Sequence, residues 1–200
     1  MSIPADQVKQ LRDQTGAGMM ECKGALQESN GDFDEAVTIL RKKGIATAAK
    51  KAGRTASEGV ITSYIHPGNR VGVLVEVNCE TDFVARTKEF QDLAHEIAVQ
   101  IAAMDPNFKT REDVPVELLN REREILLGQL ADSGKPDKIK QQIVEGRLEK
   151  WYTETVFMDQ SFVKDDTIKM HQFITSHVAK FGENIVVRRY VRFKLGESAE

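Results

Sequence analysis

Cysteine is scarce in this sequence, and long apolar runs are missing. The two cysteines, Cys22 and Cys79, lie far apart, so they indicate neither a disulfide framework nor a metal-binding knuckle. No segment approaches the run of about 20 apolar residues that a membrane-spanning helix needs, and residues 1–30 have no apolar core of the signal-peptide type. We therefore expect a reduced, cytoplasmic protein with no membrane partner. An organellar matrix or stroma reached by import is less favoured, because no transit peptide is apparent.

A strong charge imbalance is also missing. The net charge of −3 gives no general attraction to nucleic acids or to anionic membranes. Apolar residues make up 40% and charged residues 30% of the chain, as in an ordinary globular protein. The 200 residues allow one domain with an appendage or two small domains.

The sequence lacks the common catalytic and nucleotide-binding motifs. It has no phosphate-binding loop of the Gly-x-x-x-x-Gly-Lys-Ser/Thr type, no Gly-x-Gly-x-x-Gly and no Gly-x-Ser-x-Gly. The four histidines are scattered, without the spacing of a zinc site. We therefore expect no catalytic residues, no metal, no cofactor and no direct nucleotide binding, and an enzyme is disfavoured.

The N-terminal residues 1–53 predict a module of three short helices. The helices are expected to end at Gly16, at Asn30-Gly31 and at Gly44, with Asp32 as the N-cap of the third. A bundle this small is barely stable alone, so it is expected to bind a partner or dock on its neighbour. Residues 45–58 are interpreted as the linker between the two modules, a solvated helix in its alanine- and lysine-rich part.

Two adjacent methionines open the second helix of this module. Met19 shares a helical face with Cys22 and Leu26, which favours a core position. Met20 points about 100° away, and spacing leaves it open between core and surface.

Residues 59–200 predict an α+β core. Two strand-like runs, 60–66 and 71–78, flank Pro67-Gly68-Asn69-Arg70 and predict a hairpin with the alternate valines of the second run on one face. A third strand is expected over 185–195, half-buried, with a basic outer face formed by Arg188, Arg192 and Lys194. Together they predict a three-stranded antiparallel sheet covered by helices. RNA binding through the basic face is disfavoured, because Tyr190 is its only aromatic residue.

The remaining segments of the core are mainly helical. Apolar spacing predicts a helix over 87–104, a hairpin of two long helices within residues 116–152 and a helix over 167–180, whereas 153–162 is assigned as loop.

The segment Cys79-Glu80-Thr81-Asp82-Phe83-Val84-Ala85-Arg86 joins the second strand to the first long helix. Thr81 or Asp82 could cap a helix through a side-chain oxygen. Phe83 either enters the core or projects to a partner. Local chemistry alone favours Asp82 as a cap and Phe83 as a core residue.

Two long motifs resemble the elongation factor Ts family of bacteria or organelles. The first is Thr15-Gly16-Ala17-Gly18-Met19-Met20-Glu21-Cys22-Lys23-Gly24-Ala25-Leu26, and the second is Val77-Asn78 followed by Cys79 through Arg86. Further segments that look like the family are 135–147 and 184–189. The similarity covers nearly the whole chain.

This resemblance implies a guanine-nucleotide exchange factor in translation elongation. The implied partner is elongation factor Tu, both GDP-bound and nucleotide-free, whose Mg²⁺ and phosphate site would be disturbed by Thr81, Asp82, Phe83 and Val84. The family's N-terminal helices are similar to ubiquitin-associated domains and dock on the partner's GTPase domain, which implies an interface role for Met20 and partly for Met19. The segment 79–86 is then the exchange loop.

The resemblance is to the short form of the family, in which a homodimer supplies a missing half of the core. Whether this chain dimerises is left open by the sequence. A plain binding module, of ubiquitin-binding or RNA-binding type, is the competing interpretation, and an unrecognised enzyme is a third.

Overall fold

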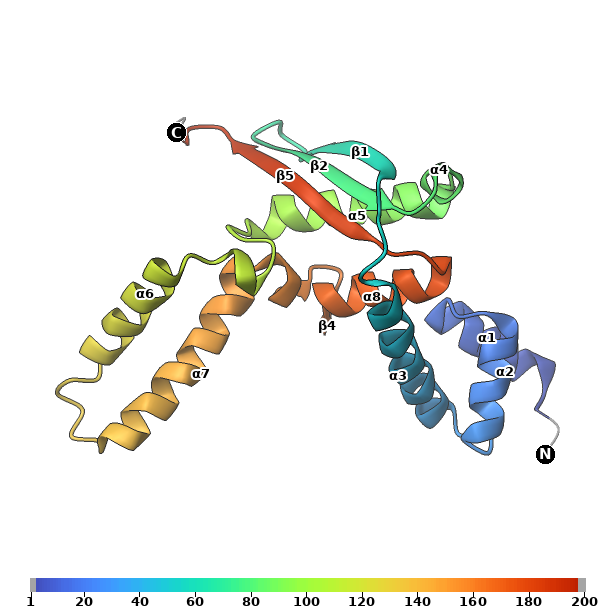
Figure 1. The fold of residues 1–200 in the computed structure, drawn as a ribbon, viewed down its shortest axis with the longest axis horizontal. Coiled ribbons are helices and arrows are strands. Elements are labelled where there is room, and N and C mark those ends of the chain that lie inside the picture. The colour runs from blue at the N-terminus through green and yellow to red at the C-terminus, as the bar shows by residue number, and fades with distance from the viewer. Residues whose placement is uncertain (1–2, 198–200) are drawn as a thin grey trace. The chain divides into compact units, whose positions relative to one another are not determined.

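A computed structural model describes residues 3–197 of the chain. Helices and strands are both present, which confirms the α+β class (Figure 1). The helices are α1 Ala5–Thr15, α2 Met19–Glu28, α3 Phe33–Lys51, α4 Asp82–Ala85, α5 Lys88–Met104, α6 Val116–Gly128, α7 Asp137–Thr155 and α8 Met170–Phe181, with 3-10 turns η1 Arg111–Asp113 and η2 Phe157–Asp159. The strands are β1 Glu58–Ile65, β2 Val71–Cys79, β3 Ser161–Phe162, β4 Asp165–Lys169 and β5 Val186–Lys194. None of the helices between residues 3 and 197 combines the length and apolar character required to span a membrane.

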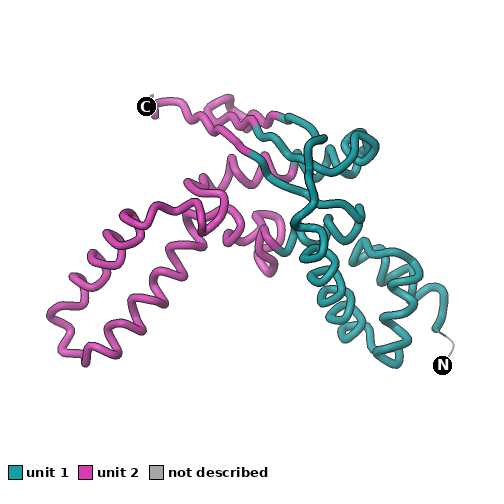
Figure 2. The backbone as a smooth tube through the Cα atoms, in the orientation of Figure 1, with its two compact units in different colours: residues 1–62, 75–95, 172–188 teal, residues 63–74, 96–171, 189–200 magenta. Residues whose placement is uncertain are grey.

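The predicted three-stranded antiparallel sheet is present, with the order β1-β2-β5. A small second sheet, β3-β4, was not predicted. The chain divides into two compact units (Figure 2). Unit 1 contains residues 1–62, 75–95 and 172–188, and unit 2 contains residues 63–74, 96–171 and 189–200.

The N-terminal part of unit 1 is the predicted bundle of α1, α2 and α3. Gly16 (φ 67°) ends α1, and Asn30 (φ 53°) and Gly31 (φ 90°) lead out of α2, because these residues tolerate left-handed backbone. The Asp32 carboxylate caps α3 by accepting from Glu35 N at 2.8 Å. The shared core is formed by Val8, Leu11, Cys22, Ala25, Leu26, Ala36 and Leu40.

The predicted end of the third helix at Gly44 was wrong. Helix α3 continues to Lys51, and Gly44 is not among the residues with positive φ. The alanines and lysines that follow have high helix propensity, and Lys50 and Lys51 in the last turn complement the negative end of the helix dipole. Nothing at Gly44 is therefore strong enough to stop the helix.

The rest of unit 1 packs the end of β2 against the start of α5 and against α8. Val75 and Val77 are buried, which confirms the predicted apolar face of this strand. The ring of Phe90 on α5 meets that of Phe181 on α8 edge to face, with centroids 5.9 Å apart. This packing holds the end of β2 and the start of α5, which lie on either side of the loop after β2.

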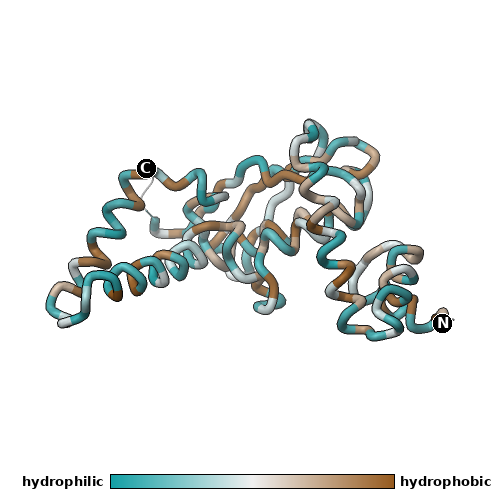
Figure 3. The backbone as a smooth tube through the Cα atoms, turned by 60° about the horizontal axis from the view of Figure 1, so that its bottom comes forward, coloured by the Kyte–Doolittle hydropathy of each residue, from teal (hydrophilic) through white to brown (hydrophobic). Residues whose placement is uncertain are grey.

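In unit 2 the helices α6 and α7 form the predicted hairpin. Its buried seam consists of Leu126, Leu130, Val144 and Leu148. Hydrophobic and hydrophilic residues alternate along both helices, as Figure 3 shows. At the base of α7 the Arg111 guanidinium binds Glu149 and Asp159, with its nearest oxygens at 2.8 and 2.7 Å.

Two predicted boundaries in unit 2 were wrong. The segment 153–162 is not all loop, because α7 continues to Thr155 and η2 and β3 follow. Residues 167–169 are not helical but belong to β4, where Ser161 pairs with Lys169. The Asp165 carboxylate accepts from Thr167 N at 3.1 Å. Such local side-chain bonds compete with helix formation, so α8 begins only at Met170.

The predicted burial of the last strand was wrong in its second half. The side chain of Arg192 is only 11% exposed, and its guanidinium lies 3.1 Å from an Asp105 carboxylate oxygen. Val191 and Phe193 are exposed instead. Ile185 and Val187 are buried as predicted. A charged group that meets a partner can be buried, and hydrophobicity alternation alone did not reveal this partner.

Candidate functional site

The loop after β2 is organised by Thr81. Thr81 is the N-cap of α4, and its hydroxyl oxygen accepts from Val84 N at 3.3 Å. Local chemistry alone had favoured Asp82 as the cap, and this is wrong. The Asp82 carboxylate lies 2.9 Å from the guanidinium of Arg86. Thr81 therefore caps the helix, and the Asp82 carboxylate is left at the surface.

Phe83 projects into solvent. Its side chain is 82% exposed, so the core position favoured by local chemistry is wrong. Two residues later, Ala85 is buried and attaches α4 to the core of unit 1. An aromatic side chain this exposed adds nothing to the core of a monomer, and its apolar surface is available to a partner.

Cys79 lies beneath this loop. Its thiol donates to the carbonyl oxygen of Thr81 at 3.2 Å. Burial raises the pKa of this thiol to about 11, so it is protonated at neutral pH. Cys22 is also buried, in the bundle core, and burial raises its pKa. Neither thiol is poised to act as a nucleophile or a metal ligand.

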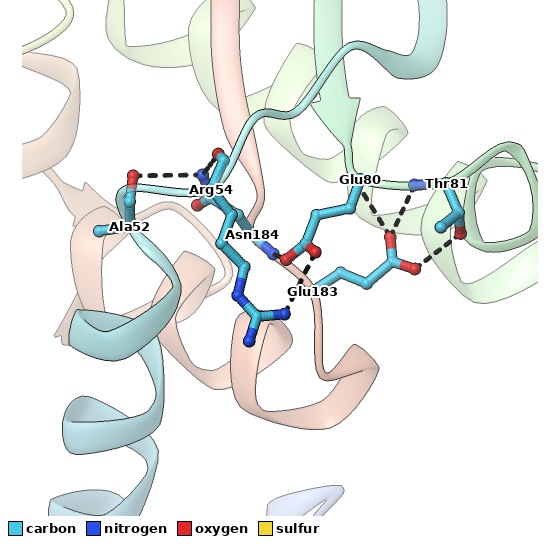
Figure 4. A network of polar contacts seen from close by, with 6 residues as sticks. All are labelled: Ala52, Arg54, Glu80, Thr81, Glu183 and Asn184. Carbon is cyan, nitrogen blue, oxygen red and sulfur yellow. Dashed lines mark hydrogen bonds and ion pairs between the residues drawn. The ribbon is translucent and has the colours of Figure 1, made fainter.

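A polar network attaches the loop to two other segments of unit 1 (Figure 4). One Glu183 carboxylate oxygen accepts from Glu80 N at 3.0 Å and Thr81 N at 3.1 Å. The other accepts from the Thr81 hydroxyl at 2.6 Å. In return, the Glu80 carboxylate accepts from Asn184 N at 2.7 Å and from the Arg54 guanidinium at 3.3 Å.

Asn184 extends the network to the segment after α3. Its buried side-chain amide donates to the Arg54 carbonyl oxygen at 2.8 Å and to the Ala52 carbonyl oxygen at 3.3 Å. The main-chain bond from Asn184, followed by the Arg54 side chain, lowers the pKa of Glu80. Three segments far apart in sequence therefore meet behind the exposed tip of the loop.

The two methionines of α2 are both at the surface. Met19 is 43% exposed and Met20 is 76% exposed, so the core position that helical spacing alone favoured for Met19 is wrong. Met19 is the first residue of α2, and the buried face of the helix is formed by Cys22, Ala25 and Leu26. Flexible, polarisable methionine side chains at a surface suit adaptable protein contacts.

The described residues contain no group of three or more His, Cys, Asp or Glu side chains that could hold a metal ion. Of the predicted site residues, Thr81, Asp82, Phe83 and Val84 lie together on the loop and α4. The roles of Glu183 and Asn184 in holding this loop were not predicted. Asn184 begins a segment that looks like the family, and Glu183 directly follows Gly182, but neither feature indicates a contact with the loop.

Comparison with known proteins decides the family. The sequence model described as Elongation factor TS matches residues 4–197. The chain belongs to the elongation factor Ts family. This confirms the resemblance carried by the two motifs, and membership makes the chain an elongation factor of protein biosynthesis with nucleotide-exchange function.

Individual members of the elongation factor Ts family match over nearly their full length. Elongation factor Ts of Syntrophomonas wolfei is 55% identical over 198 residues, which cover 99% of this chain and 92% of the relative. That of Moorella thermoacetica is 55% identical, with 98% and 96% covered. That of Herpetosiphon aurantiacus is 54% identical, with 99% and 100% covered.

Proposed function

We propose that this chain binds elongation factor Tu·GDP and promotes GDP release by inserting Asp82 and Phe83 beside the nucleotide site of that partner. The observation that carries the proposal is the 82% exposure of Phe83 on a loop whose main chain is held by a hydrogen bond from Thr81 N to the Glu183 carboxylate. Thr81 and Val84 form the turn that presents these two side chains. Exchange by this route needs no covalent step on the chain.

The proposed mechanism is a competition for the partner's phosphate and Mg²⁺ site. GDP is held largely through its phosphates and the metal ion, so displacing the groups that hold the metal weakens nucleotide binding. Burying the Phe83 side chain in a partner pocket would supply roughly 1.5–3 kcal/mol toward that displacement. The Asp82 carboxylate would meet the same region as a negative charge that disfavours the phosphates.

The bundle of α1, α2 and α3 is proposed as a second attachment to the partner. Met19 and Met20 provide exposed, adaptable apolar surface at the start of α2. This contact would hold the exchange factor while the loop acts, so its loss would weaken binding more than it slows the exchange step.

A homodimer is proposed through the exposed apolar side of the sheet in unit 2. Ile65, Leu74, Phe193 and Leu195 are exposed and line one surface hollow. Contiguous apolar surface of this kind marks interaction sites. Phe193 is 69% exposed. If the parent is a dimer, the Phe193→Glu variant is expected to sediment as a monomer. A parent that sediments as a monomer at all concentrations would contradict this part of the proposal.

The test of the exchange function uses thermodynamic linkage. If binding of this chain weakens GDP binding to elongation factor Tu, GDP with Mg²⁺ must weaken binding of this chain by the same factor. We expect the nucleotide-free partner to co-elute with the chain and excess GDP and Mg²⁺ to separate them. A complex that is unaffected by GDP and Mg²⁺ would show that the two proteins bind without exchange. We place this function in the cytoplasm, where translation takes place.

A further inference from the structure

The main chain of the exchange loop is fixed by two reciprocal carboxylate contacts. Glu183 accepts hydrogen bonds from the main-chain N–H groups of Glu80 and Thr81. Glu80 accepts from the main-chain N–H of Asn184. Each segment thus uses a charged acceptor to hold the backbone of the other. Hydrogen bonds to charged groups are among the strongest in proteins.

Glu183 also determines the orientation of the Thr81 hydroxyl. The 2.6 Å bond to Glu183 uses the hydroxyl proton of Thr81. The oxygen lone pairs are then available to accept from Val84 N, which begins α4. A single carboxylate therefore holds the main chain before the cap and orients the cap itself.

This arrangement matters because packing cannot position Phe83. A side chain that is 82% exposed takes its direction from its own backbone, and not from neighbouring side chains. The backbone of Phe83 lies between Thr81 and Ala85, the one bonded to Glu183 and the other buried. Without the Glu183 contacts, the main-chain N–H groups of Glu80 and Thr81 would lose their acceptor. The turn would then be restrained by the Glu80 side chain and by the buried Cys79 and Ala85 on either side of it, and not at Thr81 itself.

The position of Glu183 follows from the end of α8. Gly182 has φ 69° and donates its N–H to the Val178 carbonyl oxygen at 2.9 Å, which turns the chain out of the helix. The next two residues face the loop, as Figure 4 shows, and the buried Asn184 side chain fixes them to the Ala52 and Arg54 carbonyl oxygens. The carboxylate is thus held in place before it meets the loop.

We infer that Glu183 is a positioning residue for exchange, which acts by fixing the direction in which Asp82 and Phe83 are presented to the partner. The inference rests on the proposed exchange function. Glu183 itself need not touch the partner. Its contribution is expected to be the preorganisation of an exposed loop, which lowers the ordering cost at the moment of docking.

The test compares Glu183→Ala with Glu183→Gln in the full chain. Alanine removes all three acceptor contacts. Glutamine can direct its amide oxygen to the N–H groups of Glu80 and Thr81 and its amide nitrogen to the Thr81 hydroxyl oxygen, which has a lone pair for it. We expect Glu183→Ala to lower kcat/KM for GDP release from elongation factor Tu by about tenfold or more. Glu183→Gln should recover most of this loss.

Amide hydrogen exchange provides a readout of the loop itself. In Glu183→Ala, the N–H groups of Thr81 and Val84 should exchange faster, whereas the N–H of the buried Leu93 on α5 should keep its protection. Glu145→Ala is the matched control, because it removes an exposed carboxylate that pairs with Arg123 in the helical hairpin. It should leave both exchange activity and the Thr81 N–H unchanged.

A double-mutant cycle with Phe83→Ala separates positioning from general destabilisation. If Glu183 acts through the loop tip, Glu183→Ala should cost little once Phe83 is absent. Losses that multiply in the double variant, an unchanged Thr81 N–H, or equal loss of protection at Leu93 would each overturn the inference. If Glu183→Ala is as active as the parent while Phe83→Ala is slow, the inference about Glu183 is overturned and the proposed function stands. Parent-like activity of Phe83→Ala would instead overturn the proposed function and the inference with it.

Discussion

The Arg86 guanidinium lies 2.9 Å from the Asp82 carboxylate, one turn further along the chain. Both side chains are largely exposed, 81% for Arg86 and 59% for Asp82. Exposed pairs at this spacing contribute little to folding, because water screens them and two side chains lose conformational freedom. The pair is therefore a surface feature of the free protein.

Replacing Asp82 should consequently separate function from stability. We expect Asp82→Ala to change the free energy of unfolding by no more than about 0.5 kcal/mol, measured by urea denaturation. GDP release from elongation factor Tu should nevertheless slow. A stability loss above about 1.5 kcal/mol would mean that Asp82 supports the fold, and that its effect on exchange could not be assigned to the partner site.

Thr81 should be the residue of the loop that matters for stability. Thr81→Val keeps the shape of the side chain but removes the acceptor for Val84 N and the donor to Glu183. We expect a loss of about 1 kcal/mol or more in the free energy of unfolding. Thr38→Val is the control, because the exposed Thr38 hydroxyl only donates to the Asp34 carbonyl oxygen within α3. Equal effects in the two variants would argue against the cap.

Gly59 should tolerate no side chain. A Cβ at this position would lie 2.2 Å from the Val77 carbonyl oxygen, and φ is 148°. Gly59→Ala is expected to lower the free energy of unfolding by about 3 kcal/mol or more, through backbone strain and a forced shift of β2. Gly146→Ala, in the open interior of α7, should stabilise by about 0.5–1 kcal/mol. Thermal unfolding of both variants checks this contrast, and a mild Gly59→Ala would contradict the close approach.

His177 should make the protein less stable in acid. The imidazole contacts the rings of Phe173 and Phe181, and its Nδ1 is 2.8 Å from the Phe173 carbonyl oxygen. Burial lowers the pKa of this imidazole. The unfolded chain then takes up the proton first, at a pKa of about 6.5. The stability that the neutral imidazole contributes is present above pH 6.5 or so and is lost as the pH falls below it.

The comparison for His177 is with His177→Gln, by denaturation at several pH values. The stability difference between parent and variant should be largest above about pH 7 and should shrink toward pH 5. A difference that grows in acid would mean that the folded protein prefers the charged imidazole.

Periodicity was enough to predict the elements whose burial is one-sided. The bundle core around Leu11 and Leu26, the apolar face of β2 and the seam of the helical hairpin all follow from local spacing. The α+β class followed from these elements. Segments whose state depends on partners elsewhere were predicted less well.

The errors have physical causes at particular residues. Gly44 did not stop α3, since the alanines and lysines that follow it favour helix. The Arg192 side chain was expected at the surface but is mostly covered and pairs with Asp105, and a strand sequence does not encode that partner. Strand β4 exists only because β3 lies beside it.

The candidate site was predicted by resemblance, and its support was not predicted at all. Asp82 and Phe83 lie in a recognisable motif, but their exposure is decided by the tertiary structure. Glu183 lies 102 residues from Thr81, and their contact has no signature in the local sequence of either. The reciprocal bonds between these segments arise only when the fold brings them together.

The most direct test of the proposed function is the rate of GDP release from elongation factor Tu, followed by stopped flow with a fluorescent GDP. The parent chain should accelerate release. Phe83→Ala should lose roughly 10- to 150-fold in kcat/KM, which corresponds to the free energy of about 1.5–3 kcal/mol gained when an apolar side chain is buried. Val116→Ala, which shortens another exposed apolar side chain, should stay within about twofold of the parent. Equal rates for Phe83→Ala and the parent would contradict the assignment of this loop as the exchange element.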